Sequence, residues 1–169
     1  HSLTMLRRLL YWMTDRLPAR FINSDDGNPY LERYYLGSFL GLRAYIHRFV
    51  ASDPDRGLHD HPWNRSVSLL LVGGYREIRH NGERHLRPGQ LHYIRGNDFH
   101  RVLLEQGAET WSLFIHGKRV KGWGFNRHGV YIPAAITKDD NKFHDWRLTA
   151  QKARVLRATR NLTINQEKP

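Results

Sequence analysis

The hydrophobic positions at both ends of the chain follow a helical spacing. Leucine and methionine side chains recur every three or four residues between arginines, which predicts an amphipathic helix over 5–17. The far end predicts one basic helix over 143–160, in which Trp146 and Ala153 share a face. A helix with such an apolar stripe usually packs on its own domain. We therefore expect Trp146 to be buried against the outer face of the β-barrel predicted below, and the basic side chains to face solvent.

The pattern between the two helices is different. Short runs rich in leucine, β-branched and aromatic residues alternate with turn signals, at 73–74, 81–82, 88–89, 96–97 and 107. Turn signals this frequent predict an all-β sandwich or barrel. We therefore expect one domain over 5–169 with its barrel core at about 34–135. The residues before Met5, 1–4, are interpreted as the remnant of an expression tag and are left out of the functional reasoning.

Composition narrows the chemistry. A length of 169 residues suits one domain, and the absence of cysteine excludes disulfides, thiolate metal sites and thiol nucleophiles. The chain carries 27 basic and 16 acidic residues, so its net charge of +11 points either to an anionic partner or only to a soluble surface. No stretch approaches the ~20 apolar residues of a membrane span. We expect a cytoplasmic protein without a signal peptide.

One pair of histidines could bind a metal. His59 and His61 lie two residues apart between two predicted strands. On an extended segment, alternate side chains point to the same face about 6.6 Å apart, so two imidazoles can converge on one ion. With 11 histidines in the chain, about one such pair is expected by chance from composition, so the pair alone is weak. A third ligand has to come from elsewhere.

The spacing after this pair resembles the first motif of the cupin superfamily. That motif is H-x-H, three or four residues, glutamate, six residues and glycine. Here His59 and His61 are followed by four residues and Ser66, then six residues and Gly73. Ser66 thus stands where the family has its glutamate ligand, so the common set of three histidines and one glutamate is not available.

The second cupin motif follows 15 residues later. It is glycine, five residues, Pro-x-Gly, two residues and histidine, and here it runs from Gly89 through Arg95-Gly96-Asn97 to His100. The resemblance covers about residues 40–117. It implies a small jelly-roll barrel with a helix at each end of the chain, and it implies that His59, His61 and His100 form the metal site.

A neutral set of three histidines resembles the thiol dioxygenases among the cupins, which bind iron(II). The resemblance implies an iron(II) dioxygenase-like enzyme for a small anionic substrate; imidazole ligands also suit zinc, nickel or copper. In those enzymes a Tyr-x-Arg pair on an early strand binds the substrate carboxylate, and Arg43 and Tyr45 resemble it in reversed order. With Arg101, they are the expected substrate-binding or catalytic residues. The alternative is that Arg43, Tyr45 and His47 form a solvent-facing strand surface.

Two other functions stay open. One is a non-oxidative cupin such as a sugar isomerase or epimerase, in which His61 or His100 works with a tyrosine and no metal is needed. The other is a non-catalytic binding or sensing module with a basic surface for a polyanion. Nucleic acid is not expected, because aromatic residues interleave poorly with the basic ones near the end of the chain. Cupins often dimerise through sheet edges, so the resemblance also leaves a homodimer open, in which an uncovered edge would be paired.

The remaining polar candidates have simpler interpretations. Glu77 is interpreted as a surface residue or a partner of an arginine, since a tight hairpin at 73–74 would place it about 13 Å along the strand from Ser66. His116 is interpreted as a hydrogen-bonded histidine at the barrel end. Trp63 is interpreted as a core residue, and the alternative is that it forms a wall of the pocket. Four further histidines are expected at the surface: His80, His85, His128 and His144.

Overall fold

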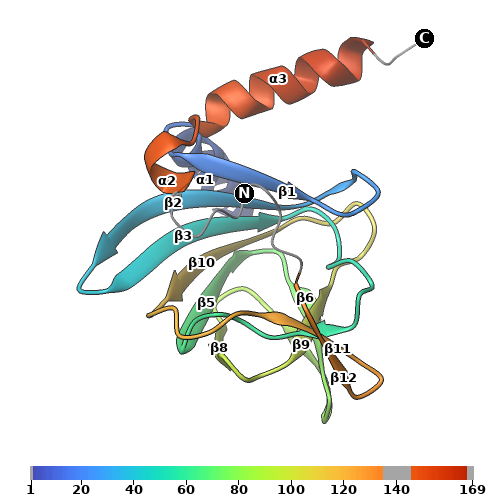
Figure 1. Ribbon diagram of the computed structural model, residues 1–169. Coiled ribbons are helices and arrows are strands. Elements are labelled where there is room, and N and C mark those ends of the chain that lie inside the picture. Colours follow the sequence, from blue (N-terminus) through green and yellow to red (C-terminus); the bar gives the residue numbers. More distant parts are fainter. Residues whose placement is uncertain (1, 135–145, 167–169) are drawn as a thin grey trace.

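Two antiparallel sheets form the body of the protein (Figure 1). A computed structural model describes the backbone of residues 2–134 and 146–166, and the side chains of 4–134 and 147–161. The first sheet has the order β1 (Ala19–Asn23), β2 (Pro29–Phe39), β3 (Leu42–Phe49), β10 (Thr110–His116), β5 (Arg65–Val72), β8 (Leu91–Arg95). The second has the order β12 (Val130–Pro133), β11 (Gly124–Arg127), β4 (Leu58–His59), β9 (His100–Leu103), β6 (Tyr75–Arg79), β7 (Gly82–Leu86).

The all-β prediction is confirmed, although strands begin earlier than expected. The expected barrel core starts at about residue 34, whereas β1 begins at Ala19 and β2 at Pro29. β1 lies at the edge of the first sheet and only Ala19 in it is fully buried. Because such a strand buries little apolar surface, its sequence lacks the alternation that identifies a half-buried strand.

The N-terminal helix ends before the predicted position. α1 spans Ser2–Thr14, where the spacing predicts 5–17. Pro18 disfavours a helical conformation for Leu17, and the backbone of Pro18 and Ala19 pairs with Lys152 and Gln151 instead. The hydrophobic spacing therefore continues for three residues beyond the helix.

The prediction of one helix over 143–160 is wrong. The structure has two helices here, α2 (Trp146–Thr149) and α3 (Ala153–Gln166). Residues 150–152 separate them because Lys152 forms a β-bridge with Pro18, and a tertiary contact of this kind leaves no glycine or proline signal in the sequence. The side chain of Trp146, and the whole of His144, lie outside the described residues.

α1 and α3 cover the outer face of the first sheet. A hydrophobic cluster forms there from buried residues of both helices and four strands: Leu10, Ala19, Tyr34, Ile46, Trp111 and Ala153. Arg157 of α3 extends into it, donating hydrogen bonds to Tyr34 Oη and Thr14 Oγ1 and pairing with Asp15. The expectation that the basic side chains of this helix all face solvent is therefore wrong for Arg157.

The space between the two sheets is the other interior. A smaller apolar cluster fills part of it, with Leu70 from the first sheet against Tyr75, Leu86 and Val102 from the second. Most of the other inward side chains are polar, and they position the site described next. No helix in the described part of the chain is long and apolar enough to cross a membrane.

Candidate metal site

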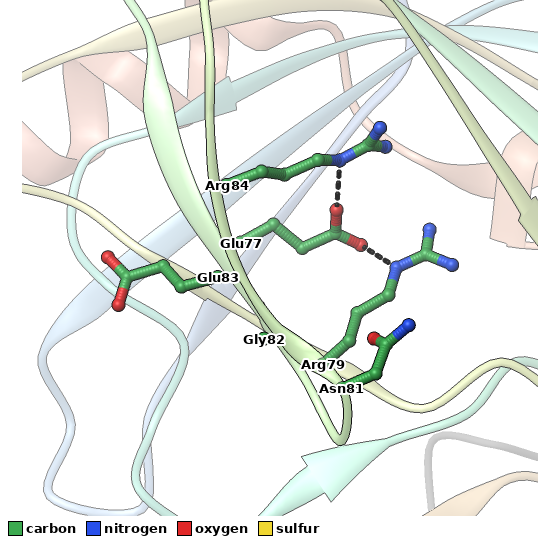
Figure 2. Close-up of a pocket in the computed structure, with 6 residues that line it drawn as sticks. All are labelled: Glu77, Arg79, Asn81, Gly82, Glu83 and Arg84. Carbon is green, nitrogen blue, oxygen red and sulfur yellow. Dashed lines mark hydrogen bonds and ion pairs between the residues drawn. The ribbon is translucent and has the colours of Figure 1, made fainter.

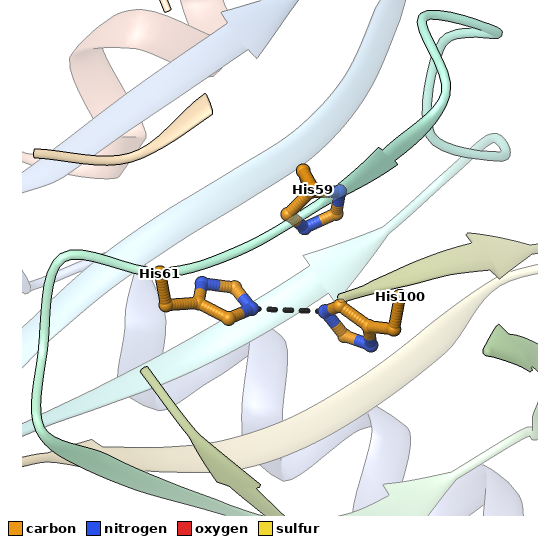
Figure 3. A group of neighbouring side chains, drawn as sticks. All are labelled: His59, His61 and His100. Atoms are coloured by element: carbon orange, nitrogen blue, oxygen red, sulfur yellow. Dashed lines mark hydrogen bonds between the residues drawn. The ribbon is translucent and has the colours of Figure 1, made fainter. Parts of the chain in front are cut away.

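Three histidines from two neighbouring strands converge between the sheets (Figure 3). β4 pairs with β9 so that His59 lies directly opposite His100, and His61 follows β4 by two residues. The potential ligand atoms of His59, His61 and His100 all lie within 4.8 Å of one another. The Nε2 atoms of His61 and His100 are 2.9 Å apart. The predicted grouping of these residues is therefore present.

Backbone contacts fix the segment that carries the pair. Asp60 points away from its two histidine neighbours, and its buried carboxylate accepts a hydrogen bond from the Gly124 backbone (2.7 Å) and pairs with Lys121. His61 N–H donates to the Gly96 carbonyl at 3.3 Å. A β-carbon on Gly96 would lie 2.4 Å from the Trp63 carbonyl oxygen, so only glycine permits this approach of the two motifs.

The imidazoles of His59 and His61 are neutral at neutral pH. Burial lowers the pKa of His59 to about 4, although the nearby Asp53 carboxylate acts in the opposite direction. Burial also lowers the pKa of His61 well below its usual range, and proximity to His100 adds to this effect. Neutral imidazole is the form that binds metal ions, because the charged form has no lone pair to donate.

The spacing of the nitrogen atoms fits a transition-metal ion. Two imidazole nitrogens bonded to one ion at about 2.1 Å and at a right angle are about 3.0 Å apart, close to the distance between His61 and His100. Ser66 contributes no carboxylate, and its buried hydroxyl donates to the Ile94 carbonyl at 3.4 Å. The donor set is therefore three imidazoles, a combination that favours iron, zinc, nickel or copper over magnesium or calcium.

Glu77 is buried behind His100, and its interpretation as a surface residue is wrong. Residues 73–74 connect β5 in the first sheet to β6 in the second, so no tight hairpin places Glu77 opposite Leu70. β6 instead lies beside β9, and Glu77 Oε1 is 3.1 Å from His100 Nδ1. The expected arginine partners are present: Arg79 and Arg84 each donate to the carboxylate (Figure 2).

His92 is a site residue that sequence reasoning missed. It is buried on β8, its Nε2 is 2.7 Å from Glu77 Oε1, and its Nδ1 is 2.9 Å from Tyr75 Oη. The alternation of exposed and buried residues in β8 places it on the same face as Ile94. The sequence could have indicated this position, because His92 and Ile94 are two residues apart in a strand and therefore point to the same, inward face.

Glu77, His92 and His100 form a second group with metal-ligand geometry. This group fits a cation less well than the three histidines do. Burial raises the pKa of Glu77, but hydrogen bonds from His100, His92 and Arg79 outweigh it and lower the pKa below its usual range. The carboxylate is thus ionised and already neutralised by two guanidinium groups, which would repel a divalent ion.

Stacked aromatic rings extend from the three histidines along the interior. Trp63 stacks on His61 (5.8 Å between ring centroids) and on His116 (4.1 Å), which in turn stacks on Tyr45 (5.5 Å). His116 Nδ1–H donates to the Gly117 carbonyl, so its interpretation as a hydrogen-bonded barrel histidine is confirmed. Tyr45 is 2% exposed, which contradicts the solvent-facing alternative for this strand surface.

The expected arginines lie elsewhere. Arg43 is exposed near the end of β3, and Arg101 is held on the opposite face of β9 from His100 by the Asp53 carbonyl and the Asp55 carboxylate. The structure therefore does not bring either arginine to the histidines. Arg33 of β2 occupies the interior instead: its guanidinium lies 4.5 Å from the Tyr45 ring centroid and 5.9 Å from that of Trp63.

Three of the remaining histidines agree with their interpretation as surface residues, and His47 is buried. His80, His85 and His128 are exposed. His47, which shares a strand face with Tyr45, is buried, stacks on Phe114 and accepts a hydrogen bond from Arg33 Nε at 3.2 Å.

Comparison with known proteins identifies the fold. No protein-family model matches the sequence, and no curated protein matches it significantly. A cupin-2 domain protein from Rhodospirillum rubrum matches with a TM-score of 0.53 and 15% identity over 73% of this chain and 78% of that one. A structure described as a sugar phosphate isomerase of the cupin superfamily from Silicibacter pomeroyi matches with a TM-score of 0.53 and 14% identity, over 74% and 90% of the two chains.

A third structure, described as a DMSP lyase, matches with a TM-score of 0.49 and 16% identity over 60% of this chain. The match spans only 57% of that chain, and it does not bear on activity. The two stronger matches agree on one architecture, and the three histidines lie inside it. The chain therefore has the fold of the cupin superfamily.

Proposed function

We propose that His59, His61 and His100 bind one divalent transition-metal ion and that the protein is an enzyme acting on a small anionic substrate beside it. The observation that carries this proposal is the convergence of three buried or half-buried imidazoles whose ligand atoms all lie within 4.8 Å. Desolvating three imidazoles costs free energy, and bonds to an ion offset that cost.

Iron(II) is the metal that we propose, following the resemblance to the three-histidine dioxygenases. Bound iron(II) would supply a redox-active Lewis acid with coordination positions left open for small molecules. The chain's own residues do the rest. Trp63 covers one side of His61 and limits water access, and Arg33, against Trp63, is placed to hold the acidic end of a substrate.

Metal content tests the first part of the proposal. Protein purified without chelator and without nickel resin is expected to contain close to one transition-metal ion per chain, measured by mass spectrometry of the elements. His61→Ala is expected to reduce it well below one, because two imidazoles remain. The control is His85→Ala, an exposed histidine on β7, which should retain the metal. Wild-type protein that binds no ion under any loading condition would contradict the proposal and favour the non-oxidative cupin.

Ligand screening tests the second part. Small carboxylic and phosphoric acids should raise the melting temperature more than their neutral analogues do. Arg33→Met should weaken binding of the best acid by about 1.5–3 kcal/mol, the range for a hydrogen bond to a charged group. Arg43→Met, matched in chemistry but exposed, should have little effect. Oxygen uptake by the iron-loaded protein with that acid then distinguishes a dioxygenase from other metal-dependent cupins.

A further inference from the structure

The carboxylate of Glu77 lies behind His100, on the side away from the other two histidines. Glu77 Oε1 is 3.1 Å from His100 Nδ1, while His100 Nε2 is 2.9 Å from His61 Nε2. The two nitrogens of one imidazole ring thus have different partners. The Glu77 side chain is 0% exposed, so water does not compete for this contact.

Two arginines and two histidines contact this carboxylate directly. Arg79 Nε donates to Oε1 at 2.8 Å and Arg84 Nε donates to Oε2 at 3.0 Å. His92 lies 2.7 Å from the same oxygen as His100, and Tyr75 Oη lies 2.9 Å from the other nitrogen of His92. The two arginines also line a small open pocket of about 150 Å³ beside the carboxylate (Figure 2). An ionised carboxylate only accepts hydrogen bonds, so the nitrogen of His100 that faces it must be the donor.

We propose that Glu77 is a positioning residue for the metal site, an inference that rests on the proposed function. By accepting a hydrogen bond from His100 Nδ1–H, Glu77 fixes the tautomer in which the Nε2 lone pair points towards His59 and His61. It also fixes the orientation of the ring. A carboxylate behind a metal-binding histidine increases the basicity of the ligand and holds it ready for the ion.

Neither His59 nor His61 has an equivalent anchor among the described residues. His59 Nδ1 is 3.9 Å from the nearest Asp53 oxygen, which is too long for a hydrogen bond. The Nε2 atom of His61 faces His100 instead, at 2.9 Å from His100 Nε2. His100 is therefore the ligand whose orientation is set before an ion binds, and the other two complete the site around it.

Long-range proton–nitrogen NMR spectra of the histidine rings test the proposal directly. In wild-type protein, both metal-free and zinc-loaded, His100 is expected to carry its proton on Nδ1. Glu77→Gln should lower zinc affinity by about 10–100-fold, the usual effect of removing such a partner, while binding at saturation stays at one ion per chain. The matched control is Glu83→Gln on the same hairpin, where the carboxylate is exposed and pairs with Arg76. It should bind zinc like the wild type.

The outcomes separate this proposal from the proposed function. Two results would overturn the positioning role alone. In the first, wild-type protein binds zinc, but His100 carries its proton on Nε2 in the metal-free state. In the second, Glu77→Gln binds zinc as tightly as the wild type does. Wild-type protein that binds no metal, yet carries the His100 proton on Nδ1, would overturn the metal function and leave the orientation of His100 by Glu77 standing. Because the tautomer is read in wild-type protein, the test holds even if Glu77→Gln fails to fold.

Discussion

Acidification should destabilise the protein through His116, which lies between Trp63 and Tyr45. Burial lowers the pKa of His116 to about 4, although the hydrogen bond to Gly117 acts in the opposite direction. In the unfolded chain its pKa is about 6.5. The unfolded state therefore binds more protons between these two values. The stabilisation is complete above about pH 6.5 and is lost as the pH falls towards 4.

The magnitude follows from the difference of about 2.5 pKa units. Each unit corresponds to 1.36 kcal/mol, so His116 accounts for a loss of about 3 kcal/mol over the whole range, and of about 2 kcal/mol between pH 7 and pH 5. The side chain is 3% exposed, so solvent screening does not reduce this figure substantially. His116→Phe keeps a ring for stacking on Trp63 but removes the titrating group.

Urea unfolding followed by tryptophan fluorescence, with a chelator present, gives the free energy of unfolding at pH 5, 6 and 7. Losing the hydrogen bond to Gly117 should make His116→Phe less stable at pH 7 by about 1 kcal/mol. Between pH 7 and pH 5, the free energy of unfolding of His116→Phe should fall by about 2 kcal/mol less than that of the wild type. His85→Gln, an exposed control, should follow the wild type. Equal pH dependence in His116→Phe and the wild type would refute the reasoning.

Three further predictions concern the core, the site and the surface. Trp111→Ala should lower the free energy of unfolding by about 3–5 kcal/mol in urea titrations, because the indole is 0% exposed and packs on Tyr11 and Tyr34; a change below 1 kcal/mol would contradict it. Gly96→Ala should reduce bound metal at saturation, since its new β-carbon displaces the segment carrying His61; full occupancy would argue against that packing. Duplex DNA should bind with a dissociation constant no lower than micromolar at physiological salt. Submicromolar binding would support the polyanion-binding alternative instead. In that case the logarithm of the affinity should fall with the logarithm of the salt concentration, with a slope of about 0.9 for each phosphate neutralised.

The sequence predicts the grouping of the three histidines better than it predicts their surroundings. The resemblance to the two cupin motifs groups His59, His61 and His100, because the motif spacings identify these positions although His100 lies far along the chain from the pair. Glu77 could not be placed in this way. A tight hairpin at 73–74 would place Glu77 in the first sheet, beside β5. Instead the chain crosses at 73–74 to the second sheet, where β6, the strand of Glu77, pairs with β9, the strand of His100. Sheet assignment depends on contacts between distant residues, which a single sequence does not show.

The same limit applies to the arginine expected to bind a substrate. The resemblance to a Tyr-x-Arg pair points to Arg43, which shares a strand face with Tyr45, and that alternation is correct. However, the face changes its environment along the strand: Tyr45 is buried between the sheets while Arg43 reaches solvent at the strand end. Arg33 reaches the interior from the neighbouring strand, and only the pairing of β2 with β3 reveals it.

The largest hydrophobic cluster lies outside the barrel, between the first sheet and its two long helices. Here the anchoring by residues such as Tyr34 and Trp111 is on the other side of the sheet from the histidines and the inward serines. Inward positions such as Ser66 and Ser112 therefore do not take part in that cluster, and a substitution that fits the local space leaves its packing intact. Robustness and specialisation therefore depend on different residues in this architecture.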